Sequence, residues 1–135
     1  MGTAVSLFQR AKDSLQAHDP QARPVLVVED DAGLRAYLVT ILEQQGYRVV
    51  AAGSGEEALE LLGNEKAMLA VLDIGLPGMD GFAVAEQLTA DVPVIVVTGD
   101  PLRAKMKAFG RSPSMTILAK PITSEAFEHA LDSLL

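Results

Sequence analysis

The chain has 135 residues, no cysteine and a formal net charge of −7 at pH 7. This length suits one domain with a core of its own, and without cysteine neither disulfide bonds nor thiolate metal sites can support the fold. The negative charge argues against a domain that holds nucleic acid by neutralising phosphates, because such binding needs clustered Lys and Arg, so we expect a metal cation or a basic partner instead.

The first 23 residues differ from the rest of the chain. Apolar residues recur at approximately helical spacing between residues 3 and 17, and a polar stretch follows up to Pro24. We predict an N-terminal amphipathic helix and linker over residues 1–23 and one main domain over residues 24–135. The helix either packs on the domain or frays, or it mediates dimers or continues a signalling helix, and the pattern leaves these alternatives open.

Five short apolar runs follow in the main domain, separated by stretches long enough for a helix. The runs are residues 25–28, 47–51, 68–72, 93–97 and 115–119, most of them rich in Val, Ile or Leu, which is typical of strands buried on both faces. Strands joined by crossover helices are parallel, and their carboxyl ends lie on one edge of the sheet. The pattern predicts an α/β fold with a doubly wound, five-stranded parallel sheet.

The helical patterns between these runs have recognisable starts. An apolar stripe from Leu34 ends before a glycine at position 46, a second helix opens after Ser54, and three more are predicted over residues 82–88, 102–109 and 125–134. The fourth is a weak prediction, because residues 110–114 form helix poorly. The residue types and spacing predict N-caps at Asp31, Ser54 and Asp100, and Asp80 with Gly81 forms a turn signal where a helix could start.

Polar residues stand at the ends of four of the runs. Glu29 and Asp30 follow the first run, Asp73 the third, Thr98 the fourth and Lys120 the fifth. Ligands of open α/β sheets bind at the carboxyl edge, so the pattern predicts a site there. Massed carboxylates are costly unless a cation intervenes, and oxygen ligands without His or Cys favour Mg²⁺, with Mn²⁺ as the alternative.

The same residues suit phosphoryl transfer. Lys120 is a positive point charge and Thr98 a small hydroxyl, and both are suited to the oxygens of a phosphoryl group. A carboxylate held beside Mg²⁺ and an ammonium group can attack phosphorus, because this reaction asks chiefly for placement and charge neutralisation. Asp73 lies centrally among these groups and is the predicted nucleophile.

Four motifs in order give the chain a family resemblance: residues 25–31, residues 73–81, Thr98-Gly99 and Lys120-Pro121. By these motifs, residues 24–135 resemble response-regulator receiver domains, the phosphoacceptor modules of two-component signalling in the CheY-like superfamily. The resemblance implies a flavodoxin-like fold with strand order 2-1-3-4-5. It also implies a cis peptide bond before Pro121, a state that proline makes accessible.

The resemblance further implies a role for each site residue. Asp73 is expected to accept the phosphoryl group, Lys120 to pair with it, and Thr98 to turn toward it after transfer. The metal ligands that it implies are Glu29, Asp30, Asp73 and the backbone carbonyl of Gly75.

The expected phosphoryl donor is the phosphohistidine of a sensor histidine kinase or of a histidine phosphotransfer protein. The domain is then no enzyme in the usual sense, but it catalyses its own phosphorylation and dephosphorylation. We expect a downstream protein to bind the face formed by the fourth helix, the fifth strand and the fifth helix, with Leu102, Met106, Ile117 and Phe127 nearby.

The apolar runs are all far shorter than the roughly 18 residues of a membrane span, and the N-terminus lacks the long apolar core of a signal peptide. The sequence therefore predicts a cytoplasmic domain without membrane or nucleic-acid contacts, as a monomer or weak homodimer.

Three alternatives compete with an active receiver. A pseudo-receiver would act as a phosphorylation-independent interaction domain, and a fragment of a hybrid histidine kinase would be a receiver within a longer chain. A phosphatase of the haloacid dehalogenase type needs a second acid two residues after its nucleophile, where this chain has Gly75. Ile117 stands where many receivers have Tyr or Phe, so rearrangement of the fourth helix would have to replace the rotation of an aromatic ring.

Overall fold

The computed structural model describes residues 22–76, 78–89, 91–108 and 115–135. The elements in chain order are β1 (Val25–Val28), α2 (Ala32–Gln44), β2 (Val49–Ala52), α3 (Gly55–Leu62), β3 (Leu69–Asp73), α4 (Gly81–Gln87), β4 (Val94–Thr98), α5 (Pro101–Ala108), β5 (Met115–Ala119) and α6 (Ser124–Leu134). The helix expected between residues 3 and 17 and the segment 109–114 lie outside the described residues.

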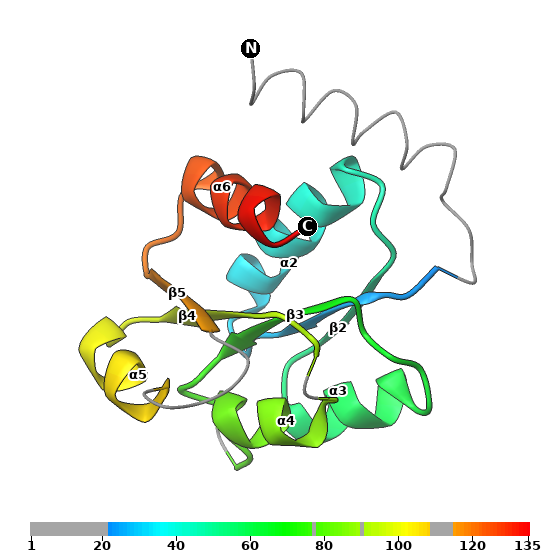
Figure 1. Cartoon of the computed structure of the whole chain (residues 1–135), viewed down its shortest axis with the longest axis horizontal. Coiled ribbons are helices and arrows are strands. Elements are labelled where there is room, and N and C mark those ends of the chain that lie inside the picture. Colours follow the sequence, from blue (N-terminus) through cyan, green and yellow to red (C-terminus); the bar gives the residue numbers. More distant parts are fainter. Residues whose placement is uncertain (1–21, 77, 90, 109–114) are drawn as a thin grey trace.

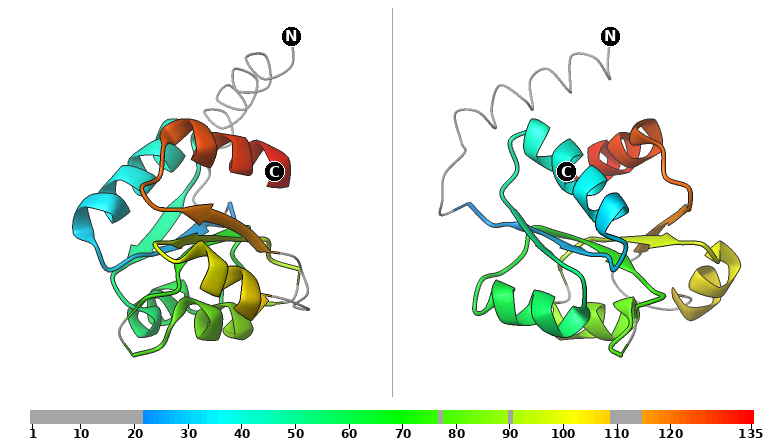
Figure 2. Two further views of the ribbon diagram at one scale, coloured as in Figure 1. Left: turned by 90° about the vertical axis from the view of Figure 1, so that its left-hand side faces the viewer. Right: turned by 180° about the vertical axis from the view of Figure 1, so that it is seen from behind.

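The five strands form one sheet in the order β2-β1-β3-β4-β5, and all four pairings are parallel. Helices α2 and α6 cover one face of the sheet, and α3, α4 and α5 cover the other (Figures 1 and 2). The predicted fold class and the strand order 2-1-3-4-5 are both confirmed.

Alternation along the central strands divides the core into two layers. Val25 and Val27 of β1 pack with α2 and α6, whereas Leu26 and Val28 pack on the side of α3 and α4. Successive side chains of a strand point to opposite faces, so a strand covered on both faces must be apolar throughout. For this reason the runs of Val, Ile and Leu predicted the central strands well.

Side-chain caps fix where four helices begin. Asp31, Ser54, Asp80 and Asp100 each accept the backbone N–H of the residue three positions later, at 2.9 to 3.2 Å. Each contact satisfies a donor that has no partner within the helix, and so stabilises the first turn. The caps predicted at Asp31, Ser54 and Asp100 are confirmed, and so is the helix start predicted at Asp80, which also caps its helix. Helix α5 starts with proline at its first position.

Two details of the prediction are wrong. The second strand begins at Val49 rather than at residue 47, because the Tyr47 N–H still donates to the carbonyl of Leu42 at the end of α2. Phe127 is 0% exposed and packs in the core between the sheet, α2 and α6, so it cannot line a surface for a downstream protein.

In the part of the chain that is described, no helix is long and apolar enough to cross a membrane.

The start of α4 lies tightly against the end of β3. A Cβ atom on Gly81 would come 2.5 Å from the backbone oxygen of Asp73 and 3.0 Å from its carbonyl carbon. Backbone atoms cannot move aside as a flexible side chain can. We therefore predict that Gly81→Ala lowers the free energy of unfolding by about 1–3 kcal/mol, the usual cost of overpacking, as measured by urea denaturation.

Gly99→Ala is the matched control, because a Cβ on Gly99 would meet nothing within 4 Å. Its effect should stay within about 0.5 kcal/mol, as for most surface substitutions. Equal stability of the two variants would contradict the close packing of α4 on β3.

Candidate functional site

The predicted site residues come together at the carboxyl edge of the sheet. Asp73 and Thr98 are the last residues of β3 and β4, and Glu29, Asp30 and Lys120 directly follow β1 and β5. Glu29 is 1% exposed, Asp73 6% and Thr98 2%, whereas Lys120 is half-buried and Asp30 is exposed. The edge thus has a buried polar floor with access from solvent.

Three carboxylates form an acidic cluster. Glu29, Asp30 and Asp73 each offer an oxygen, and these atoms lie within 4.8 Å of one another. Asp31, the next acid along the chain, accepts the N–H groups of Gly33 and Leu34 at the start of α2. Asp31 is therefore a helix cap, as predicted, and not part of the cluster.

The Lys120 ammonium bridges two of these carboxylates. Its Nζ lies 3.0 Å from Asp73 Oδ2 and 3.2 Å from Glu29 Oε1. Burial alone would lower the pKa of Lys120, but its hydrogen bonds to Asp73 and Glu29 and their charges outweigh burial and hold that pKa above its ordinary value. The ammonium is therefore a permanent positive charge at this edge. The Lys120–Pro121 peptide bond is cis, as expected.

Glu29 is the least solvated acid of the site. Burial raises its pKa to about 7, helped by the charge of Asp73 and opposed by the Asp31 N–H and by Lys120. Its Oε2 accepts the Asp31 N–H at 3.1 Å, and the one polar partner of its buried Oε1 among the described residues is the Lys120 ammonium, which Asp73 shares. A buried carboxylate oxygen with so little compensation, beside two further carboxylates, fits a hard divalent cation.

Arg35 of α2 holds the end of β1 in place. Its Nη1 donates to the backbone carbonyl of Glu29 at 2.8 Å. No sequence pattern marks Arg35 as part of the site, because a contact between a helix side chain and a strand carbonyl leaves no motif.

The Asp73 carboxylate is fixed at both oxygens. Oδ1 accepts the backbone N–H of Gly75 at 2.8 Å, and Oδ2 receives Lys120. Gly75 itself is exposed and carries no side chain that could cover Asp73. The carboxylate is therefore oriented and still open to a reactant.

A pocket of about 310 Å³ opens onto Asp73. Its lining consists of Asp73, Ile74, Gly75, Thr98, Gly99, Asp100, Arg103 and Lys120. Thr98 Oγ1 accepts the Asp100 N–H at 2.9 Å, which uses an acceptor position and leaves its hydroxyl hydrogen to donate. Sequence analysis assigned Asp100 as a cap and overlooked Arg103, although the two are linked, because the Arg103 N–H donates to Asp100 Oδ1.

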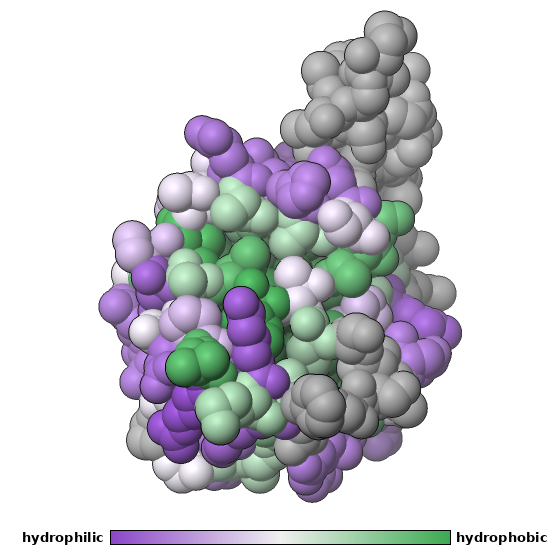
Figure 3. All heavy atoms as spheres, turned by 60° about the vertical axis from the view of Figure 1, so that its left-hand side comes forward, coloured by the Kyte–Doolittle hydropathy of each residue, from purple (hydrophilic) through white to green (hydrophobic). Residues whose placement is uncertain are grey.

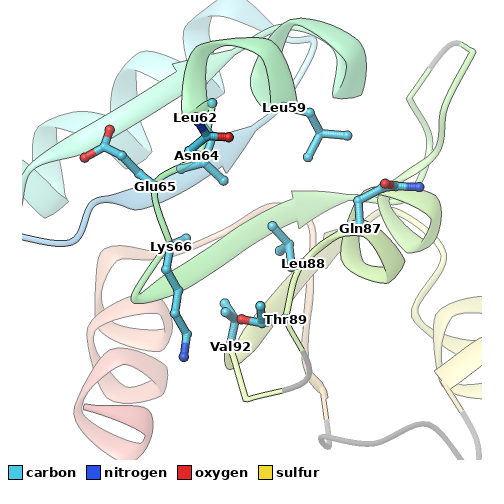
Figure 4. Close-up of a pocket in the computed structure, with 11 residues that line it drawn as sticks. Leu59, Leu62, Asn64, Glu65, Lys66, Gln87, Leu88, Thr89 and Val92 are labelled. Carbon is cyan, nitrogen blue, oxygen red and sulfur yellow. The ribbon is translucent and has the colours of Figure 1, made fainter.

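A second pocket of the same volume lies near the ends of α3 and α4, with Lys66 and Val92 at its border (Figure 4). Its lining is mixed, with Leu59, Leu62 and Leu88 beside polar residues such as Glu65 and Lys66. Size and polarity therefore do not distinguish the two pockets. The candidate site is identified by the cluster of three carboxylates at Asp73, paired with the Lys120 ammonium.

Comparison with known proteins identifies a family for this chain. The sequence model of the response regulator receiver domain matches residues 25–132. The transcriptional regulatory protein AfsQ1 of Streptomyces coelicolor is 43% identical over 76 residues, which are 55% of this chain and 34% of that protein. The transcriptional regulatory protein GlrR of Escherichia coli is 34% identical over 114 residues, 82% of this chain and 26% of that protein. The chain thus spans about a third or less of these relatives.

Solved structures agree in fold. The non-phosphorylated HemR receiver domain of Leptospira biflexa has a TM-score of 0.74 and 31% identity, and the match covers 84% of this chain and 94% of that one. The response regulator TrrA of Thermotoga maritima, in complex with Mg²⁺ and BeF, has a TM-score of 0.71 and 26% identity, and the match covers 84% of this chain and 100% of that one. Because the receiver model matches most of the chain and the fold agrees, this protein belongs to the response regulator receiver domain family of two-component signalling.

Proposed function

We propose that Asp73 accepts a phosphoryl group from the phosphohistidine of a sensor histidine kinase or a histidine phosphotransfer protein. The observation that carries this proposal is the Asp73 carboxylate, fixed by Gly75 and Lys120 and open to a pocket beside two further acids. Phosphoryl transfer depends on placement and charge neutralisation, which these contacts supply.

Glu29, Asp30 and Asp73 would hold Mg²⁺, with the backbone carbonyl of Gly75 as a further ligand and Mn²⁺ as the alternative ion. When bound, the ion supplies positive charge that lets an anionic phosphoryl group approach the carboxylates. Support comes from the oxygen-only donor set and from the buried Oε1 of Glu29, whose one polar partner among the described residues is the Lys120 ammonium. Arg35 acts indirectly, by fixing the backbone that carries the acidic pair.

In the transfer step a carboxylate oxygen of Asp73 attacks phosphorus. The new O–P bond forms as the donor's P–N bond breaks, and the imidazole leaves with the bonding electrons and takes up a proton. Lys120 donates to the phosphoryl oxygens, and the Thr98 hydroxyl donates once it turns toward them. Water attack on the acyl phosphate would later restore Asp73, so the domain would catalyse both halves of its own cycle.

Phosphorylation would shift the population between two conformations. Charge-assisted hydrogen bonds to the new group supply a few kcal/mol in total. A change in the ratio of two conformations from 1:99 to 99:1 needs about 5.5 kcal/mol, so these bonds suffice to invert a modest initial preference. The outward side of α5 is the proposed output surface, because Leu102 and Met106 are 68% and 71% exposed. Figure 3 shows apolar surface between polar stretches on this side of the molecule, where α5, β5 and α6 lie.

The partner proposals concern this domain alone. AfsQ1 and GlrR are named transcriptional regulatory proteins, and the segments matched here are 34% and 26% of their lengths. For the domain itself we propose binding to a kinase and to a downstream protein, in the cytoplasm. A pseudo-receiver is the second candidate, although every acid, hydroxyl and ammonium of the expected set is present.

We predict a covalent phosphoryl group on Asp73. Incubation with acetyl phosphate and Mg²⁺ should add the mass of one phosphoryl group to the intact protein, because acetyl phosphate is a small donor that needs no kinase contact. Asp73→Asn and a chelator should each abolish the addition. No addition, under conditions where a known receiver is modified, would favour the pseudo-receiver.

We also predict that Mg²⁺ stabilises the folded domain through Asp30. A ligand that binds only the folded state adds about 2.7 kcal/mol to the free energy of unfolding when its concentration is a hundred times its Kd. Urea denaturation with and without Mg²⁺ at such a concentration would measure this gain. Asp30→Asn should lose most of this gain.

Asp31→Asn is the matched control for that substitution. It removes the same charge one residue away, and asparagine still caps the helix that Asp31 caps. Its gain from Mg²⁺ should equal that of the parent protein. If both variants lost the gain equally, local net charge rather than a ligand at Asp30 would explain it.

A further inference from the structure

We propose that Arg103 is a further phosphoryl-binding residue of this site. The inference rests on the proposed function of Asp73 and adds a residue to it. Arg103 lies in the first turn of α5 and lines the pocket together with Asp73, Thr98 and Lys120.

The Arg103 guanidinium forms no ion pair with a described carboxylate. Within the part of the chain that the structure describes, no carboxylate lies within ion-pair distance of its guanidinium, whereas the neighbouring cation of the pocket, Lys120, pairs with both Asp73 and Glu29. A phosphoryl group on Asp73 would bring at least one more negative charge into a pocket that also contains the Asp100 carboxylate. Arg103 is the cation in the pocket that can form an ion pair with the phosphoryl group without breaking an existing ion pair.

The backbone of Arg103 is held in register with Thr98. The Asp100 N–H donates to Thr98 Oγ1, and Asp100 Oδ1 accepts the Arg103 N–H at 3.1 Å. One short relay therefore links the hydroxyl expected to bind a phosphoryl oxygen to the start of α5. The Arg103 side chain is exposed and can therefore change rotamer. Its planar set of N–H donors matches phosphoryl oxygens.

The test measures how tightly the full chain binds beryllofluoride, a stable phosphoryl mimic, at saturating Mg²⁺. Fluorine NMR reports both the affinity and the environment of the bound fluorines. Lys105→Gln is the matched control for Arg103→Gln, because it removes the same charge from the same helix at an exposed position that does not line the pocket.

Arg103→Gln should weaken beryllofluoride binding about tenfold, the scale of one charge-assisted hydrogen bond, and should move a bound fluorine resonance. Arg103→Lys should recover part of the affinity, and Lys105→Gln should match the parent protein in both readouts. The affinity for Mg²⁺ alone should not fall in Arg103→Gln, because Arg103 is no part of the acidic cluster.

Three results would overturn the inference: parent-like binding and resonances in Arg103→Gln, an equal loss in Lys105→Gln, or an equal loss of Mg²⁺ affinity. If Arg103→Gln failed to fold, as judged by thermal unfolding, Arg103→Lys would decide, since unchanged affinity and resonances there would also contradict a direct contact. A parent protein that bound Mg²⁺ but no beryllofluoride would contradict the proposed function itself.

Discussion

Two buried carboxylates at one edge of the sheet, compensated by a single ammonium group, are the constraint on which the rest of the site depends. Glu29 and Asp73 end neighbouring parallel strands, so the fold forces their charges together, and Lys120 reaches both from the far side of β4. Isolated buried charges are expensive, and one cation between two anions leaves part of that cost unmet. The raised pKa of Glu29 expresses this deficit directly. A site of this kind favours binding of further positive charge, which is the role that the proposed function gives to the metal ion before a phosphoryl group arrives.

Packing around the edge keeps these groups in place. Arg35 and the Gly75 N–H fix the chain at the ends of β1 and β3, while Gly81 lets α4 begin against the backbone of Asp73. A reactive carboxylate needs an orientation that does not change as a reactant arrives, and backbone contacts are well suited to provide it. The Asp100 relay gives Thr98 a similar attachment to α5, which connects the chemistry with the helix that exposes Leu102 and Met106.

The sequence was sufficient for the sheet and for most of the site, for reasons that are local. Strands covered on both faces are apolar throughout, and a polar residue directly after such a strand must lie at its carboxyl edge, so Asp73 and Lys120 could be placed without coordinates. The caps at Asp31 and Asp100 were also local patterns. Contacts between distant segments could not be found in this way: Arg103 and Arg35 look like ordinary exposed arginines in the sequence, and Phe127 gave no sign that it faces α2 rather than the output side.

The position of Asp73 as the last residue of a strand limits how the sequence of this domain can evolve. Asp73 pairs in register with Val97, and side chains alternate between the two faces along β3. Exchanging one aliphatic residue for another within β3 changes volume only, whereas inserting or deleting a single residue would either shift the whole apolar set of the strand to the wrong faces or turn the carboxylate away from Lys120. Length variation among homologous chains should therefore concentrate in the loops and helices on the opposite edge, and the strand should drift in composition while keeping its number of residues.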